Sequence, residues 1–375
     1  MDINPFVLNP YEKKELFCDR ENEVEKLVKM VENRENITLI SPRRYGKTGL
    51  IYRLFDELKD RKSEVETYYV DVFSTRNLAE FVTRLTEAMV GVLRKESLIK
   101  RFFTSLGGIR PLLSYDPLSG SPQVAITWQS HQEKQMTLKA ILEYLERGGR
   151  PVVLAIDEFQ QVREFEDCNM EALLRTYVQP LHNVRFIFCG SKKHVMLEMF
   201  ADARRPFYES TTLFFLDKIS LEAYSEFVGR QFALRGRSIS DEAVEWIMEW
   251  TRRHTYYTQY LCNKIFATGK KEVGLKDAYA VAGEVLKGME MSFIELKSLL
   301  TTGQWNYLRA VAKEGVLRQP TASVFLTRYG IATAAGSKRI LAALMDKELI
   351  LSTTTMDGVE YCVYNVFLSR WMERR

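Results

Sequence analysis

Short apolar runs alternate with helical patterns through the first two thirds of the sequence. Nearly continuous apolar character marks the segments 37–41, 67–72, 152–157, 184–190 and 211–216. Continuous rather than alternating runs are typical of parallel strands that helices cover on both faces. Helical length and periodicity mark the stretches 21–32, 46–59, 78–95, 136–147 and 170–182. The alternation predicts an α/β fold built on a doubly wound parallel sheet.

One segment, residues 109–127, interrupts this alternation. It contains two short apolar runs on either side of a turn that is rich in Pro, Gly and Ser. Such a turn between two strand patterns is typical of a hairpin, and we predict one that projects from the sheet.

The pattern changes after residue 219. Helical patterns follow at 221–234, 241–251, 256–268 and 275–300, and Ser240 is a candidate N-cap because acidic residues come directly after it. Three further helical patterns, at 304–313, 322–329 and 334–346, precede two strand patterns at 349–354 and 359–365. This is the order of a winged helix-turn-helix. The predicted domains are an α/β domain at 1–219, a helical subdomain at 220–300 and a winged helix at 301–375.

The composition adds little to this picture but excludes some classes of protein. Hydrophobic residues make up 46% of the chain and charged residues 27%, as in ordinary globular proteins. No stretch approaches the roughly 18 consecutive apolar residues that a membrane span needs. The first residues lack the basic and apolar segments of a secretory signal. Five scattered cysteines without CxxC spacing indicate reduced thiols and predict a cytoplasmic protein.

The segment SPRRYGKT, residues 41–48, joins the first predicted strand directly to a helix. Backbone N–H groups at such a helix start attract anions, and the helix dipole favours them further. In a phosphate-binding loop of this kind, Gly46 permits close approach of the backbone, Lys47 reaches the β- and γ-phosphates, and the Thr48 hydroxyl ligates Mg²⁺. Serine replaces the usual first glycine. We predict that ATP contacts the loop residues Ser41, Pro42, Arg43, Arg44, Tyr45, Gly46, Lys47, Thr48 and Gly49.

Two arginines in this loop have a second interpretation. Arg43 and Arg44 could support the nucleotide site or contact a partner, but exposed loop arginines are as often simply solvated. The pattern alone does not choose between these roles.

The predicted strand at 152–157 ends at two carboxylates, Asp157 and Glu158. Ligands of open α/β sheets bind at the carboxyl edge of the strands, where both residues would lie. We predict that Asp157 holds Mg²⁺ through water and that Glu158 polarises the attacking water, with Lys47 in the same catalytic unit. Ser191, which follows the next predicted strand, is a candidate hydrogen-bond donor to that water or to the γ-phosphate, or else a plain turn residue.

Together these motifs resemble the AAA+/STAND class of P-loop ATPases, and in particular the archaeal-type ATPases that are also widespread in bacteria. The resemblance runs through the segments 16–27, 41–48, 156–160, 188–191, 254–261 and 366–372. It implies an adenine pocket beside the first of these segments, a helical lid at 220–300 and a C-terminal winged helix. It also implies a phosphate contact for His254, although a lone histidine on a lid helix is more often structural.

The chain departs from this family pattern at two places. Arg253 and Thr255 replace the usual Gly and Pro of the lid motif, so lid closure is expected to differ. Glu209 and Ser210 stand where the family commonly has Gly-Arg, which weakens the case for an arginine finger there. Arg204 and Arg205, four to six residues earlier, are the substitutes, with surface charge as the alternative.

The charge of the winged helix bears on its partner. From residue 301 to the end there are ten Lys/Arg and six Asp/Glu, an excess equal to the net charge of +4 of the whole chain. A basic helix-turn-helix favours a nucleic-acid partner. The predicted recognition helix, however, offers mainly Ser337, Lys338 and Arg339 among apolar residues, and winged helices also contact proteins. Both partners stay open, as does a homo-oligomer.

Three functions fit these predictions. The first is a Mg²⁺-dependent ATPase whose nucleotide state controls conformation or assembly. The second is a STAND-type signalling switch or scaffold with slow hydrolysis, and the third is a DNA-binding regulator that uses ATP as a ligand.

Overall fold

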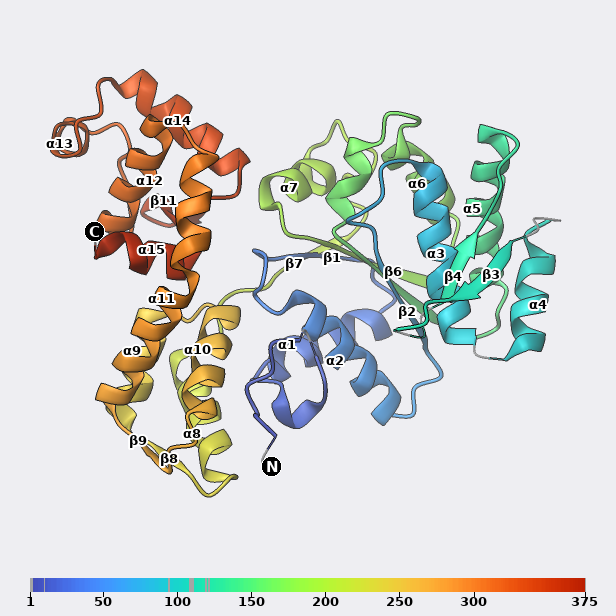
Figure 1. The fold of residues 1–375 in the computed structure, drawn as a ribbon. Helices are drawn as coiled ribbons and strands as arrows, with labels where there is room; N and C mark the ends of the chain where they lie inside the picture. The colour runs from blue at the N-terminus through green and yellow to red at the C-terminus, as the bar shows by residue number, and fades with distance from the viewer. Residues whose placement is uncertain are drawn as a thin grey trace. The chain divides into compact units, whose positions relative to one another are not determined.

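The computed structural model describes residues 3–9, 11–93, 95–107, 111–118, 120 and 122–374. The chain divides into two compact units. One unit is Pro10–Asp217; the other combines Met1–Asn9 with Lys218–Arg375. Figure 1 labels the helices and strands of both units. The division at 219/220 and at 300/301 that we derived from the sequence stays a prediction.

The first unit contains the predicted doubly wound sheet. Its strands are β1 (Ile37–Ile40), β2 (Glu66–Asp71), β5 (Val152–Asp157), β6 (Val184–Gly190) and β7 (Thr212–Phe215). They pair in parallel in the order β2-β5-β6-β1-β7. Both faces carry buried apolar side chains, which is why these strands are continuous rather than alternating in hydrophobicity. Because all five strands run the same way, their carboxyl ends share one edge, and β6 separates β1 from β5 there.

Helices cover the sheet on both faces (Figure 1). On one face, Leu27 of α1 (Glu21–Glu32) and Leu50 of α2 (Lys47–Asp60) belong to the same apolar cluster as Leu39 of β1. On the other face, Phe81 of α3 (Leu78–Leu93) and Ile141 of α5 (His131–Glu146) share a cluster with strand residues. The helices of this unit are η1 (Lys14–Leu16), α1 (Glu21–Glu32), α2 (Lys47–Asp60), α3 (Leu78–Leu93), α4 (Glu96–Ser105), α5 (His131–Glu146), η2 (Phe159–Glu164), α6 (Met170–Val178) and α7 (Lys193–Ala201).

Two short elements confirm the predicted hairpin. β3 (Leu112–Tyr115) and β4 (Pro122–Ala125) pair antiparallel. Positions 109, 110, 119 and 121 of the predicted segment lie outside the described residues. The helices α4 and α7 were not expected from the sequence, because at ten and nine residues they are too short for a clear helical period.

The second unit contains the predicted helical region, formed by α8 (Leu221–Ala233), α9 (Asp241–Trp250), α10 (Thr255–Ala267) and α11 (Leu275–Ser298). The backbone N–H of Ala243 donates to Ser240 Oγ at 3.3 Å, so Ser240 is the N-cap that its position predicts. A pair of two-residue strands, β8 (Ser238–Ile239) and β9 (Glu272–Val273), was not expected in this region. Strands this short leave no readable period in the sequence.

The winged helix follows in the same unit. It comprises α12 (Thr302–Glu314), α13 (Ser323–Arg328), α14 (Ala334–Asp346), the antiparallel hairpin β10 (Ile350–Thr355) and β11 (Gly358–Val363), and α15 (Val366–Glu373). The Trp371 ring of α15 lies 5.6 Å from Phe293 of α11 and 6.2 Å from Trp305 of α12, measured between ring centroids. Among the helices in the described part of the chain, none is long and apolar enough to cross a membrane.

Residues 3–9 form a strap that packs into the helical region of the second unit. Phe6 is fully buried there, with its ring centroid 5.6 Å from Phe232 and 6.1 Å from Phe266. Asn4 Nδ2 donates to the Asn263 carbonyl at 2.9 Å, and Asn263 Nδ2 donates to the Phe6 carbonyl at 2.7 Å. The chain therefore passes between the two units twice, once before residue 11 and once at Asp217–Lys218.

Removal of the Phe6 ring is expected to destabilise the second unit. Phe6→Ala leaves a cavity among the surrounding aromatic rings, which costs about 3–5 kcal/mol for a buried phenylalanine. Denaturant unfolding measures this as a lower midpoint for one of the transitions. Ile3→Ala is the matched control, because the Ile3 side chain is 75% exposed. Equal midpoints for the two variants would show that the Phe6 ring contributes nothing to the stability of this unit.

Candidate nucleotide site

The loop between β1 and α2 has the backbone that close phosphate approach requires. Positive φ angles fall on Arg44 (62°) and Gly46 (94°), and Gly46 immediately precedes the first residue of α2. Ser41 is not among the described residues with positive φ, so its β-carbon is tolerated where a glycine is usual. The Ser41 N–H donates to the Gly190 carbonyl at 3.3 Å, which ties the loop to the end of β6. The departure at Ser41 therefore leaves the loop intact.

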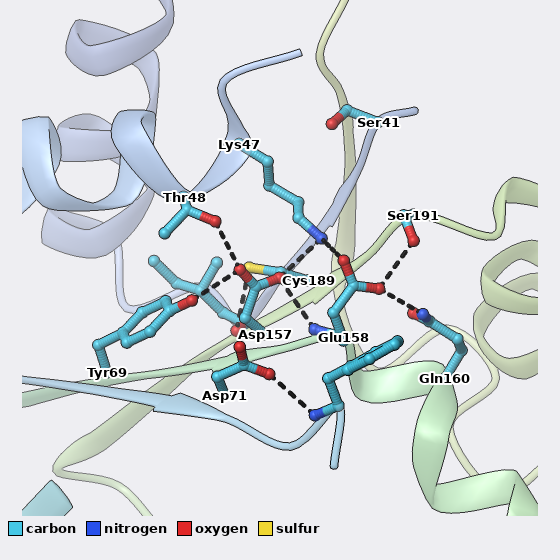
Figure 2. A network of polar contacts seen from close by, with 12 residues as sticks. Ser41, Lys47, Thr48, Tyr69, Asp71, Asp157, Glu158, Gln160, Cys189 and Ser191 are labelled. Carbon is cyan, nitrogen blue, oxygen red and sulfur yellow. Dashed lines mark hydrogen bonds and ion pairs between the residues drawn. The ribbon is translucent and has the colours of Figure 1, made fainter. Parts of the chain in front are cut away.

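The first two residues of α2 contact the carboxylate at the end of β5 (Figure 2). Lys47 Nζ lies 2.7 Å from Asp157 Oδ1, and Thr48 Oγ1 donates to Asp157 Oδ2 at 2.8 Å. Lys47 Nζ also lies 3.3 Å from Glu158 Oε1. Lys47 and Asp157 are only 6% and 3% exposed, so this is a buried ion pair. Residues that are more than a hundred positions apart in sequence thus meet at one point of the sheet edge.

The opposite charges of Lys47 and Asp157 determine their protonation states. Burial alone would lower the pKa of Lys47, but the charges of Asp157 and Glu158 outweigh it and raise the pKa. Burial alone would raise the pKa of Asp157, but Lys47, together with hydrogen bonds from Thr48 and Tyr69, lowers it. Both groups are therefore ionised at neutral pH.

Glu158 is held by its own set of donors. It takes a left-handed backbone (φ 55°) between β5 and η2. Ser191 Oγ, just after β6, donates to Glu158 Oε2 at 2.7 Å, and Gln160 Nε2 donates to the same oxygen. A β-carbon at Gly190 would lie 2.5 Å from Gln160 Oε1, so the glycine leaves room for this arrangement. The strand order explains the meeting, because β6 lies between the strands that carry the loop and the acidic pair.

The remaining loop residues surround these side chains. Tyr45 and Gly49 are buried, Pro42 is half-buried, and Arg44 is exposed. The guanidinium carbon of Arg43 lies 5.3 Å from the centroid of the Phe73 ring, a cation–π distance. Arg43 thus has a contact within the chain, and its role toward a nucleotide stays a prediction.

Three other candidate residues have contacts of their own outside this network. His254 belongs to the second unit, where it is buried with its ring centroid 4.6 Å from that of Tyr257. Arg205 forms an ion pair with Glu198, and Arg163 and Arg205 lower the pKa of Glu198 to about 2. Arg204 is 88% exposed and pairs with Asp202 at 2.7 Å. Their predicted roles are untested by this geometry.

Sequence reasoning missed two members of the network, Gln160 and Tyr69. Gln160 lies within the segment 156–160, two residues after Glu158, but the sequence does not show that its side chain turns back to Glu158. Tyr69 OH donates to Asp157 Oδ2 at 2.9 Å from the neighbouring strand β2. A tyrosine in an apolar run reads as a core residue, and only the pairing of β2 with β5 shows its contact.

Comparison with known proteins agrees with this geometry. Residues 17–256 match the family described as "ATPase domain predominantly from Archaea", and residues 291–374 match the one described as "Probable winged helix domain". No curated protein matches the sequence significantly. The fold and the loop define a P-loop ATPase with AAA+-like architecture. The chain belongs to the family of ATPase domains found predominantly in Archaea.

Solved structures share the fold over nearly the whole chain. A Walker-type ATPase of Pyrococcus abyssi is 19% identical with a TM-score of 0.67, and covers 98% of this chain and 99% of its own. The ORC2 protein of Aeropyrum pernix, in complexes with ADPNP and ADP, is 14% identical with a TM-score of 0.60 over 100% of this chain and 96% of its own. The ORC1 protein of the same organism, in complex with DNA, is 13% identical with a TM-score of 0.53 over 99% and 96%. At these identities the likeness concerns the fold.

Proposed function

We propose that this ATPase hydrolyses Mg²⁺–ATP at the network formed by Lys47, Thr48, Asp157 and Glu158. The observation that carries the proposal is their convergence, with Asp157 within 2.8 Å of both Lys47 Nζ and Thr48 Oγ1. Phosphoryl transfer depends mainly on positioning and on neutralisation of charge, and these four side chains supply both.

The donors at this point suit Mg²⁺. Thr48 offers a hydroxyl oxygen and Asp157 a carboxylate, both hard oxygen ligands. Among the described residues, no three His, Cys, Asp or Glu side chains form a metal cage of their own. That suits an ion which is usually held by one or two protein oxygens, with phosphate oxygens and water completing its shell. Thr48 would hold Mg²⁺ directly and Asp157 through water, and the ion would neutralise charge on the phosphates.

The remaining steps, phosphate binding and activation of water, are assigned to side chains of the network. Lys47 is proposed to leave Asp157 for the β- and γ-phosphates, which offer it a larger negative charge. Glu158 orients the attacking water and accepts its proton. Ser191 and Gln160 fix the Glu158 carboxylate by donating to its second oxygen, which leaves Oε1 for the water once Lys47 has moved to the phosphates. Backbone N–H groups of the loop 41–49 would surround the phosphates, with His254 of the second unit as a further proposed contact.

We further propose that the nucleotide state controls assembly or a partner contact. Arg204 supports assembly, because its exposed side chain could reach the γ-phosphate of ATP that is bound by a neighbouring copy. Lys338 and Arg339 support a partner contact, because both are exposed on α14, in a domain that has more Lys and Arg than Asp and Glu. A relative of the same fold was solved with DNA. A STAND-type scaffold with slow hydrolysis differs from this proposal in rate rather than in site.

Light scattering separates these possibilities. The protein is measured with ADP and with a non-hydrolysable ATP analogue, each with and without a DNA duplex. We expect a larger mass with the ATP analogue than with ADP. A DNA partner would add mass at low salt and lose it as salt rises, because phosphate contacts release counterions. An unchanged monomer under all four conditions would contradict both the assembly and the DNA proposals.

A further inference from the structure

The Asp157 carboxylate has four hydrogen-bond donors, two on each oxygen. Oδ1 accepts from Lys47 Nζ at 2.7 Å and from the backbone N–H of Glu158 at 2.9 Å. Oδ2 accepts from Thr48 Oγ1 at 2.8 Å and from Tyr69 OH at 2.9 Å. A carboxylate has about four acceptor positions, so the set is complete.

These four donors differ in what else they are proposed to do. Lys47 and Thr48 face the phosphates and the metal, so both would exchange their bond to Asp157 for a contact to Mg²⁺–ATP. Tyr69 and the Glu158 N–H have no such second role. Tyr69 is thus the side-chain donor that remains on Asp157 when the nucleotide is bound.

The position of Tyr69 on β2 explains its reach. Tyr69 pairs with Ala155, and Asp71 pairs with Asp157. Since Ala155 is two residues before Asp157 on β5, the side chains of Tyr69 and Asp157 lie on the same face of the sheet. Figure 2 shows Tyr69 approaching Asp157 from the side opposite Glu158. The Tyr52 ring of α2 packs against the Tyr69 ring, with centroids 5.0 Å apart, and holds it in place.

We propose that Tyr69 is a positioning residue for the metal site: its hydroxyl fixes the orientation of the Asp157 carboxylate when Mg²⁺–ATP is bound. This inference rests on the proposed function, in which Asp157 holds Mg²⁺ through water. Groups that orient a metal ligand from outside the coordination shell matter strongly, since their removal typically weakens metal binding or activity by about 10- to 100-fold.

Binding of a fluorescent, non-hydrolysable ATP analogue, titrated with Mg²⁺, tests the proposal without recourse to activity. Tyr69→Phe removes only the hydroxyl. We expect the Mg²⁺ concentration for half-maximal binding to rise about tenfold, with binding at saturating Mg²⁺ changed much less. A merely structural role would instead weaken binding equally at every Mg²⁺ concentration.

Tyr68→Phe is the matched control. Tyr68 is the neighbouring residue of the same strand, on the other face, and its hydroxyl donates to Glu66 at 3.0 Å. Thermal unfolding without nucleotide shows whether each variant is folded. An unchanged Mg²⁺ midpoint for folded Tyr69→Phe, with a Mg²⁺-dependent wild type, would overturn the inference about Tyr69 alone. Binding by the wild type that ignores Mg²⁺ would instead overturn the proposed metal role of Asp157.

Discussion

Replacement of Glu158 by glutamine is expected to lower the turnover number for ATP by about 10²- to 10⁴-fold, the usual contribution of a general base. Glutamine keeps the size of the side chain and can still be held by Ser191, which donates to Oε2 at 2.7 Å. It cannot accept a proton from water. Affinity for ATP should change little, since Lys47 and Thr48, the side chains proposed to hold the phosphates and Mg²⁺, are unaltered. Steady-state phosphate release and equilibrium binding measure the two effects separately.

Glu164→Gln is the control for this substitution. It makes the same chemical change at an exposed residue of η2, the short helix that follows Glu158. Turnover by Glu164→Gln should equal that of the wild type. Normal turnover by Glu158→Gln would remove Glu158 from the role of base, and equal losses in both variants would point to a general effect of charge.

Replacement of Lys47 by alanine is expected to abolish useful ATP binding. Truncation of a buried, hydrogen-bonded charge typically costs about 2–5 kcal/mol or more, so affinity should fall by about thirtyfold to several thousandfold. The same change leaves Asp157 as a buried carboxylate without its cation. Loss of one partner of a buried pair also lowers the free energy of unfolding, here by about 3 kcal/mol, since three other donors remain. Lys59→Ala, an exposed lysine in the last turn of the same helix, is the control.

The stability loss in Lys47→Ala should depend on pH. In the wild type, the lowered pKa of Asp157 contributes stability above the unfolded pKa, and this is lost as pH falls through the folded value. Without Lys47 the pKa of Asp157 is expected to rise, because burial is then opposed by hydrogen bonds alone. The two proteins should therefore differ less at acidic pH, where Asp157 of the variant is protonated, than near pH 7. Urea unfolding at both pH values measures this, and a pH-independent difference would argue against the buried pair.

The main residues of the nucleotide site could be predicted from the sequence because they lie at the ends of predicted strands. Lys47 and Thr48 follow one apolar run, and Asp157 and Glu158 end another, so general rules for open α/β sheets place them at one edge. The order of the strands in the sheet could not be predicted from the sequence. The position of β6 between β1 and β5, which brings Ser191 to Glu158, depends on long-range pairing that leaves no periodic signal.

Contacts between distant segments account for what the sequence could not predict. Tyr69 is one of several aromatic residues in an apolar run, and its hydroxyl bond to Asp157 depends on the register of β2 against β5. Phe6 lies in a short N-terminal segment with no pattern of its own, and its burial depends on rings contributed by α8 and α10. In both cases the contacting residue lies far away in sequence and could be of several types. Composition and spacing therefore do not predict the contact.

The most direct test of Mg²⁺-dependent hydrolysis through Glu158 is to identify the nucleotide that each protein holds after one encounter with labelled ATP and Mg²⁺. The wild type and Glu158→Gln are each mixed with substoichiometric ATP, quenched after increasing times and analysed for ATP and ADP. We predict that the wild type converts its bound ATP to ADP, while Glu158→Gln binds ATP with similar affinity and retains it unhydrolysed. Conversion at the same rate in both proteins, or conversion by the wild type that proceeds equally well without Mg²⁺, would contradict the proposed mechanism.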